Sequence, residues 1–357
     1  MRKYITEWTV GLDLGDRKSM ICMLDRDGKV VERVSIETRQ EALKKFFARF
    51  HDPVRVCVAI ETGTHSPWVS HLLMSDGFEV LVGNARKLRA VWDTVNKSDV
   101  RDAELLARIA RFDAELLCPI HHRGREAHMD LAVIKARDAL VRSRTDLINF
   151  VRGTVKAAGT RLPGCSAEAF HRRVAEHVPE ALRPALNQVL ATVATLTAEI
   201  RRYDARIDSM CEERYAETVR LRGIDGVGPI TSLAFVLSLE SPGRFRKSRD
   251  VGPFLGLTPR RDQSGETDRQ LHISKAGNGY LRRLLVNASN YIMGPFGPDC
   301  DLRRYGERIA ARGGKIARRK AKVAVARKLA VLLHHLWSHP EEEYEPFSRK
   351  HRRKHVA

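Results

Sequence analysis

Four carboxylates in the first third of the chain stand where they could bind metal ions. Asp13 lies in GLDLG at the end of an apolar run, and Glu61 ends the apolar run CVAIE. Asp99 and Asp102 lie three residues apart in NKSDVRDAELL, at the predicted start of a helix, so they share one helical face. Each acid alone has an ordinary explanation, because acids cap strands and are favoured at helix N-termini.

Taken together, the four acids indicate metal-dependent chemistry on phosphodiesters. Two acids that end adjacent strands and two on one helical turn can meet at the same edge of a sheet, where they repel one another unless cations are bound. Oxygen ligands suit Mg²⁺, and two Mg²⁺ ions about 4 Å apart can activate a nucleophile and stabilise a leaving oxygen. A basic protein with such a site is expected to be a nuclease or a phosphoryl-transfer recombinase.

A polar stretch in the last third, TPRRDQSGETDRQLHISKAG, contains a serine among cations. Ser264 is followed by Gly265, and such a pair usually forms a turn. The neighbouring Arg260, Arg261, Arg269 and Lys275 could bind phosphates, or they could be solvated charges. These residues alone leave open whether Ser264 is a turn residue or a nucleophile.

The acids require an element order that brings them together, and residues 1–125 predict one. Apolar runs predict strands at 8–14, 19–24, 30–36, 54–60 and 78–82, and periodic patterns predict helices at 41–50, 68–75 and 99–112. This order predicts an α/β domain.

Residues 126–215 predict a long helical hairpin. Apolar residues from Leu182 to Met210 recur with alternating spacings of four and three, as in a heptad seam, and a break containing Gly159, Pro163 and Gly164 separates this segment from an earlier one. The pattern does not indicate whether the partner helix belongs to the same chain, and the hairpin could be a spacer, a dimerisation arm or a nucleic-acid cradle.

Residues 216–340 predict a third, mainly helical domain, followed by a basic tail at 341–357. Gly226 and Gly228 precede a helix that begins at Pro229, a spacing similar to a helix-hairpin-helix that grips a nucleic-acid backbone, although a simple tight turn fits equally. The segment 312–337 carries eight Lys or Arg residues and no acid, which favours phosphate contact. Its candidate contacts are Arg318, Arg319, Lys320 and Lys322.

The composition points to a polyanionic partner. The 357 residues have a formal net charge of +19 and a pI of about 10.0, which favours nucleic acid. The six cysteines form no CxxC pair, as expected for reduced thiols in a cytosol, and give no zinc site. No run is long and apolar enough for a membrane span, and the N-terminal segment has no signal-peptide core.

The chain resembles the DEDD transposases of bacterial insertion sequences, the IS110 family with its IS1111 branch. The resemblance lies in the order and spacing of five motifs: GLDLG, AIETGTHSPW, NKSDVRDAELLARIAR, GIDGVGPITS and FLGLTPRRDQSGETDRQLHISKAGNGYLRRLL. The resemblance implies a RuvC-like, RNase H-like N-terminal domain, a coiled-coil insertion and a C-terminal transposase domain. It also implies that Asp13, Glu61, Asp99 and Asp102 bind Mg²⁺ and that Ser264 attacks the DNA. The family motif begins KTD where this chain has Lys97-Ser98-Asp99, which keeps the hydroxyl.

The resemblance further implies donor and target DNA, a structured guide RNA (the bridge RNA), and a dimer or tetramer in which the acids of one protomer meet the serine of another. A bacterial cytoplasmic, nucleoid-associated location follows. Two alternatives remain at this point. One is a hydrolytic nuclease, transposase or junction resolvase in which water attacks, and the other is a non-catalytic nucleic-acid-binding protein.

Overall fold

The computed structural model describes residues 6–88, 98–265 and 267–347. The chain divides into two compact units, residues 1–125 and 126–357. The change in sequence pattern after residue 125 coincides with this division. The further boundaries expected after residues 215 and 340 stay predictions, as does the basic stretch 349–355, which lies outside the described residues.

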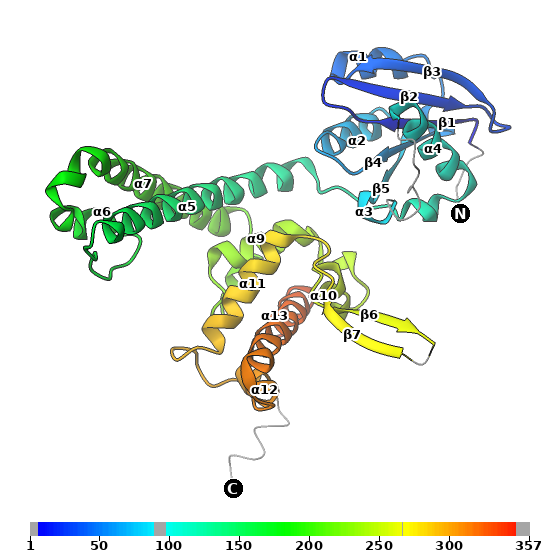
Figure 1. Cartoon of the computed structure of the whole chain (residues 1–357). Coiled ribbons are helices and arrows are strands. Elements are labelled where there is room, and N and C mark those ends of the chain that lie inside the picture. Colours follow the sequence, from blue (N-terminus) through cyan, green and yellow to red (C-terminus); the bar gives the residue numbers. More distant parts are fainter. Residues whose placement is uncertain (1–5, 89–97, 266, 348–357) are drawn as a thin grey trace, which may run out of the picture. The chain divides into compact units, whose positions relative to one another are not determined.

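A five-stranded mixed sheet forms the centre of the first unit (Figure 1). Its order is β3-β2-β1-β4-β5, in which the first three strands are antiparallel and β4 and β5 continue the sheet in parallel with β1. The strands are β1 Trp8–Asp13, β2 Lys18–Leu24, β3 Val30–Glu37, β4 Val56–Glu61 and β5 Glu79–Gly83. The five strands expected from apolar runs are therefore confirmed.

The burial of each strand follows from its position in the sheet. The interiors of β1 and β4 are buried throughout, as expected for central strands covered on both faces. The edge strand β3 instead alternates between half-buried and exposed residues along its whole length. The strand order thus places the two strands that carry Asp13 and Glu61 next to each other in the middle.

Helices cover both faces of the sheet. On one face, α1 (Gln40–Phe47) and α2 (Ser66–Ser75) pack on Val10, Leu12 and Ile60 in a core that includes Phe47 and Phe78. On the other face, α4 (Asp99–Phe112) packs its apolar side on small residues of the strands, among them Ala59 and Cys22. The α/β architecture expected for this part of the chain is confirmed.

The second unit begins with two long antiparallel helices, α5 (Arg125–Ala157) and α7 (Arg183–Glu213) (Figure 1). The end of α5 and the start of α7 share a core with the connecting segment, centred on Phe170. Halfway along, Arg137 of α5 forms an ion pair with Asp204 of α7. The heptad seam on α7 therefore packs at least in part against a helix of the same chain, through residues such as Leu186 and Val193.

The base of this helical pair belongs to a larger helical core. Leu131 of α5 and Met210 of α7 pack in one cluster with α9, α11 and α13. From Thr231 to Leu239, every residue of α9 is buried, so this helix is the centre of the unit. The long helices of this core are α9 Pro229–Leu239, α11 Gly279–Ile292, α12 Asp301–Ala310 and α13 Gly314–Ser338. The second unit also has the short helices α6 Phe170–Arg173, α8 Glu217–Leu221 and α10 Val251–Phe254, and the first unit has the short helix α3 Ala85–Leu88.

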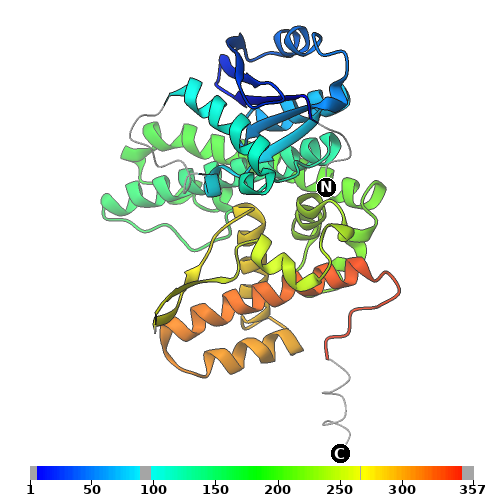
Figure 2. The same cartoon turned by 90° about the vertical axis from the view of Figure 1, so that its right-hand side faces the viewer.

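A two-stranded antiparallel ribbon, β6 (Pro259–Ser264) and β7 (Thr267–Ile273), projects from the helices of this unit (Figures 1 and 2). The residues of β6 are all exposed, and those of β7 are exposed except the half-buried Ile273. The sequence pattern did not predict these strands, because a ribbon without a buried face shows no apolar alternation.

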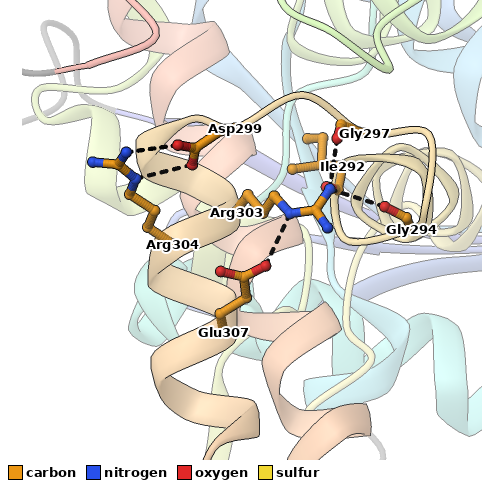
Figure 3. Close-up of polar contacts among 7 residues, drawn as sticks. All are labelled: Ile292, Gly294, Gly297, Asp299, Arg303, Arg304 and Glu307. Atoms are coloured by element: carbon orange, nitrogen blue, oxygen red, sulfur yellow. Dashed lines mark hydrogen bonds and ion pairs between the residues drawn. The ribbon is translucent and has the colours of Figure 1, made fainter.

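The turn between α11 and α12 is held by a single arginine (Figure 3). The guanidinium Nη1 of Arg303 donates to the carbonyl oxygens of Ile292, Gly294 and Gly297, at 3.5, 2.9 and 2.5 Å. Its Nε pairs with Glu307 at 2.9 Å. A cation at the C-terminus of a helix satisfies carbonyls that lack partners within the helix, so Arg303 caps α11.

Candidate functional site

Asp13 and Glu61 are the last residues of two adjacent parallel strands. Leu12 of β1 is paired with Ile60 of β4, so the following residues, Asp13 and Glu61, are neighbours at the carboxyl edge of the sheet. Side chains alternate between faces along a strand, and Leu12 and Ile60 pack under α1 and α2. Asp13 and Glu61 therefore both lie on the opposite face, the one that α4 covers.

Helix α4 begins at the other pair of acids. Ser98 is its N-cap, and the Ser98 Oγ accepts a hydrogen bond from the backbone N–H of Arg101 at 3.4 Å. Asp99 and Asp102 fall in the first turn, where Asp99 is exposed and Asp102 is half-buried. The serine of the NKSD stretch thus has a structural function, while its neighbour Lys97 lies outside the described residues.

The direction of α4 brings its first turn to the edge that holds Asp13 and Glu61. Arg108 and Phe112, near the end of α4, line one cavity of about 700 Å³ with Thr6 and Gly28. Thr6 comes just before β1 begins, so the end of α4 lies at the start of β1 and α4 runs antiparallel to that strand. All four acids are consequently at the same end of the first unit.

The four acids do not form a closed metal cage. Over residues 6–88, 98–265 and 267–347, no group of three or more His, Cys, Asp or Glu side chains is arranged to hold a metal ion. The donor atoms nevertheless fit in kind, because they are carboxylate oxygens, the ligands that Mg²⁺ and similar hard cations prefer. The magnesium site thus stays a prediction.

A histidine and an acid that the motifs did not single out flank the same edge. His65 precedes α2 in the loop after Glu61, and Asp16 lies in the loop after Asp13. The His65 Nε2 is 3.7 Å from the Asp16 Oδ1, while the Trp68 indole N–H donates to the His65 Nδ1 at 3.0 Å. The sequence contains one signal for this arrangement, the stretch HSPW that follows Glu61.

Ser264 is the last residue of β6 and stands at the tip of the exposed ribbon. It is paired with Thr267 of β7, so only two residues connect the strands. The first of them, Gly265, has a φ of +53°, the positive value that two-residue hairpin turns require at this position and that glycine adopts without strain. Ser264 is therefore both a turn-flanking residue and an exposed hydroxyl, and the two interpretations do not exclude each other.

The cations expected around Ser264 differ in their surroundings. Arg261 forms a bidentate pair with Asp268, with Nε–Oδ1 and Nη2–Oδ2 distances of 2.7 and 2.6 Å. Arg260 and Arg269 are exposed on the two strands. Lys275 lies just beyond the ribbon in the left-handed region, with a φ of +53°.

The ISKAGN stretch forms the base of the ribbon. The N–H of Ser274 donates to the carbonyl of Thr258 at 2.9 Å. A Cβ at Gly277 would stand 2.0 Å from the carbonyl oxygen of Phe254, so the backbone segments at these two residues are too close together for a side chain at position 277. Asn278 then caps α11, because its Oδ1 accepts from the N–H groups of Tyr280 and Leu281. The stretch anchors the ribbon that carries Ser264.

The remaining predicted nucleic-acid contacts lie on helix ends and helix faces of the second unit. Gly226 has a φ of +84°, and Gly228 is the N-cap of α9, where the turn borders a groove of about 490 Å³ lined in part by Arg222 and Tyr291. The four cations on α13 are all exposed: Arg318, Arg319, Lys320 and Lys322. The acids belong to the first unit and Ser264 to the second.

Two family models match the chain. Residues 10–159, which include the four acids, match the DEDD transposase model of IS110 elements. Residues 219–299, which include Ser264, match the Transposase IS116/IS110/IS902 family. The candidate residues from both units thus fall in segments matched by transposase families.

Relatives that match most of the chain give the same result. The chain is 28% identical over 293 residues to the transposase for insertion sequence element IS1111A of Coxiella burnetii, which covers 80% of this chain and 77% of that protein. It is 28% identical to a "Probable family 20 transposase" of Pseudomonas aeruginosa, over 94% of this chain and 98% of the relative. It is 27% identical to the transposase for IS1328 of Yersinia enterocolitica, over 80% of this chain and 83% of that protein.

No helix in the described part of the chain is long and apolar enough to cross a membrane.

Proposed function

Because this chain belongs to the IS110 family of transposases, we propose that it is the RNA-guided recombinase of a bacterial insertion sequence. Membership in the family implies DNA transposition as the activity. The proposal adds the route: DNA strands are cut and exchanged through a covalent phosphoserine intermediate, with Mg²⁺ at the acids and a structured RNA as guide.

The observation that carries the proposal is the placement of Asp13 and Glu61 at neighbouring strand ends, on the face covered by α4. The first turn of α4 brings Asp99 and Asp102 to the same end of the unit. This arrangement, on a mixed five-stranded sheet, supports a RuvC-like assignment to the RNase H fold and a site for divalent cations. When bound there, Mg²⁺ would make a hydroxyl more acidic and neutralise charge on the phosphate.

Ser264 is the proposed nucleophile. Its Oγ forms a bond to phosphorus while the bond from phosphorus to a sugar oxygen breaks; the hydroxyl proton is lost to solvent and the released sugar oxygen takes up a proton. Attack on the phosphoserine by a sugar hydroxyl of another strand reverses these changes and reseals the DNA without ATP. An exposed position at the ribbon tip gives Ser264 access to a DNA backbone.

The charge distribution supports nucleic-acid partners. The net charge of +19 provides attraction for donor DNA, target DNA and the bridge RNA. We assign backbone contact to the helix-hairpin-helix-like turn at Gly226 and Gly228 and to the exposed cations of α13. Because strand exchange requires several strands cut together, a dimer or tetramer in the bacterial cytoplasm, associated with the nucleoid, completes the proposal.

Trapping the covalent intermediate tests this function. The full-length protein is purified with its RNA, and both are incubated with Mg²⁺ and duplex DNA that spans the ends of the element. Wild type should give a protein–DNA adduct that survives denaturation, Ser264→Ala should give none, and Ser274→Ala, a serine ten residues away, should give the wild-type amount. Recombination by Ser264→Ala without an adduct would instead support the hydrolytic alternative.

The acids are tested separately from the serine. Asp13→Asn should abolish the adduct while the protein still binds DNA, and removal of divalent cations with a chelator should have the same effect. Adduct formation at wild-type rate in the presence of chelator would rule out the role of Mg²⁺. Unchanged nucleic-acid binding with no strand transfer under any condition would leave only the non-catalytic alternative.

A further inference from the structure

The register of the ribbon separates its side chains into two faces. Residues directly opposite each other in an antiparallel pair lie on the same face, and successive residues alternate. Ser264 is paired with Thr267 and Asp262 with Arg269, so these four share the face that we call the serine face. The opposite face, the back face, carries the pairs Gln263–Asp268 and Arg261–Gln270.

The back face is internally neutralised. Both oxygens of the Asp268 carboxylate accept hydrogen bonds from the Arg261 guanidinium, across a diagonal between the strands. This hydrogen-bonded cation lowers the pKa of Asp268 below its usual value. Bidentate geometry fixes both side chains, so the pair braces the strands on the side away from Ser264.

The serine face carries Arg269 with Asp262 directly opposite it, but Arg269 is not held in a bidentate pair as Arg261 is on the back face. Within residues 6–88, 98–265 and 267–347, Arg269 is exposed and forms no ion pair. It stands on β7 diagonally across from Ser264 on β6, and neighbours in that relation are about 7–8 Å apart. This separation is close to the span from a phosphorus to the next phosphate along a nucleic-acid strand, so one strand can lie along both residues.

The base of the ribbon is held firmly by the backbone around it. Gly256 has a φ of +65°, and a Cβ at this position would stand 2.3 Å from the N–H nitrogen of Ala276 at the base of the ribbon. The guanidinium of Arg282 donates to the carbonyls of Leu255 and Ala276 at 2.8 and 2.7 Å, which fixes both sides of the base. A two-stranded β-ribbon has the dimensions to enter the major groove of duplex DNA.

We propose that the serine face of the β6–β7 ribbon lies against duplex DNA and that Arg269 contacts the phosphate at or next to the one that Ser264 attacks. Arg261 is a positioning residue, which acts through Asp268 on the back face and does not contact DNA. The assignment of Ser264 rests on the proposed function, whereas the choice of the face rests on the register and the ion pair.

A binding experiment tests the face without depending on the chemistry. The dissociation constant of the full-length protein for a 30-base-pair random-sequence DNA duplex is measured by fluorescence anisotropy between about 50 and 200 mM KCl. Loss of one phosphate contact lowers the slope of log K against log salt by about one. Arg269→Ala should show this change, while Arg261→Ala combined with Asp268→Ala, which removes no net charge, should keep the wild-type slope. Far-UV circular dichroism confirms that each variant is folded.

A second measurement follows adduct formation at saturating protein. Arg269→Ala should slow it about 100-fold, as expected for loss of a cation at a phosphoryl-transfer site. Arg261→Ala and Asp268→Ala should slow it by a smaller and equal factor, and the exchange Arg261→Asp with Asp268→Arg should restore much of the rate. The face assignment would be overturned if the double variant Arg261→Ala with Asp268→Ala had a shallower salt slope than wild type while Arg269→Ala kept the wild-type slope.

The two proposals fail in different ways. Adducts that persist in Ser264→Ala would overturn the nucleophile but leave the salt slopes to decide the face. In another outcome, Arg269→Ala keeps the wild-type salt slope on DNA and shows a shallower slope only on a 30-base-pair RNA duplex. That result would place the ribbon on the guide RNA and overturn this inference. An adduct that depends on Ser264 but not on Arg269 would do so as well.

Discussion

Gly11 of β1 lies directly against the backbone of Ala103 of α4. A Cβ at position 11 would stand 1.9 Å from the carbonyl oxygen of Ala103 and 2.6 Å from the backbone nitrogen of Ala107, so only glycine permits this approach. Gly11 is two residues before Asp13, and Ala103 follows Asp102. The contact therefore fixes how closely the helix that carries Asp99 and Asp102 approaches the strand that carries Asp13.

Replacing Gly11 should destabilise the first unit and separate the acids. Gly11→Val inserts a branched side chain where backbone atoms already touch, and we expect a loss of about 3 kcal/mol or more. Differential scanning calorimetry should show a fall in Tm of about 10 °C. Gly63→Ala is the matched control, because a Cβ there meets nothing within 4 Å. Equal Tm values for the two variants would contradict the close contact.

Asn278 links the base of the ribbon to α9 as well as capping α11. Its Nδ2 donates to the Ser238 Oγ at 2.8 Å, while its Oδ1 caps the helix. Asn278→Ala should lose about 1–2 kcal/mol, as expected for removal of an N-cap together with a second hydrogen bond. Asn278→Asp retains the capping oxygen and should lose clearly less. Chemical denaturation measures both, and an alanine variant no weaker than the aspartate variant would exclude the capping function.

The acid side of the candidate site could be anticipated from the sequence because its determinants are local. Buried central strands read as continuous apolar runs, so the ends of β1 and β4 are visible where those runs stop, at Asp13 and Glu61. Ser98 marks the start of α4 as an N-cap. The close approach of α4 to β1 depends on the missing side chain at Gly11, a contact that the sequence does not reveal.

The serine side could not be anticipated in the same way. The ribbon has almost no buried residues, so its strands carry no periodic apolar signal. Its base depends on Gly256 and Gly277 meeting residues far along the chain, a contact that only the folded structure defines. The cations of the ribbon read alike in sequence, and only the register distinguishes Arg261 from Arg269. Helix α12 likewise lay outside the predicted elements.

The cap formed by Arg303 should be worth more than the neighbouring exposed ion pair. Arg303→Ala removes the donor to the last carbonyl of α11 and to two carbonyls of the following turn, and we expect a loss of about 2 kcal/mol in the free energy of unfolding. Arg304→Ala, which breaks a surface pair with Asp299, should change stability much less. Both residues are drawn in Figure 3. Urea unfolding followed by circular dichroism compares them, and equal losses would contradict the capping function.

His334 should make the second unit less stable in mild acid. Its ring is buried, with Nε2 3.0 Å from the Pro242 carbonyl oxygen and Nδ1 2.9 Å from the Ser248 Oγ. Burial lowers the pKa of His334 below its usual value, so the folded chain holds a neutral ring. The unfolded chain, with a histidine pKa of about 6.5, takes up a proton first as the pH falls.

The stabilisation by neutral His334 is therefore complete above about pH 6.5. It is lost as the pH falls from there to the lowered pKa of the folded state, and the free energy of unfolding decreases by no more than about 1.4 kcal/mol per pH unit. The Tm at pH 5 should lie below that at pH 7, and His334→Gln should reduce the difference, because glutamine does not titrate. His272→Gln, on the exposed ribbon, is the control and should keep the wild-type difference. Equal pH dependence in His334→Gln and wild type would show that another group is responsible.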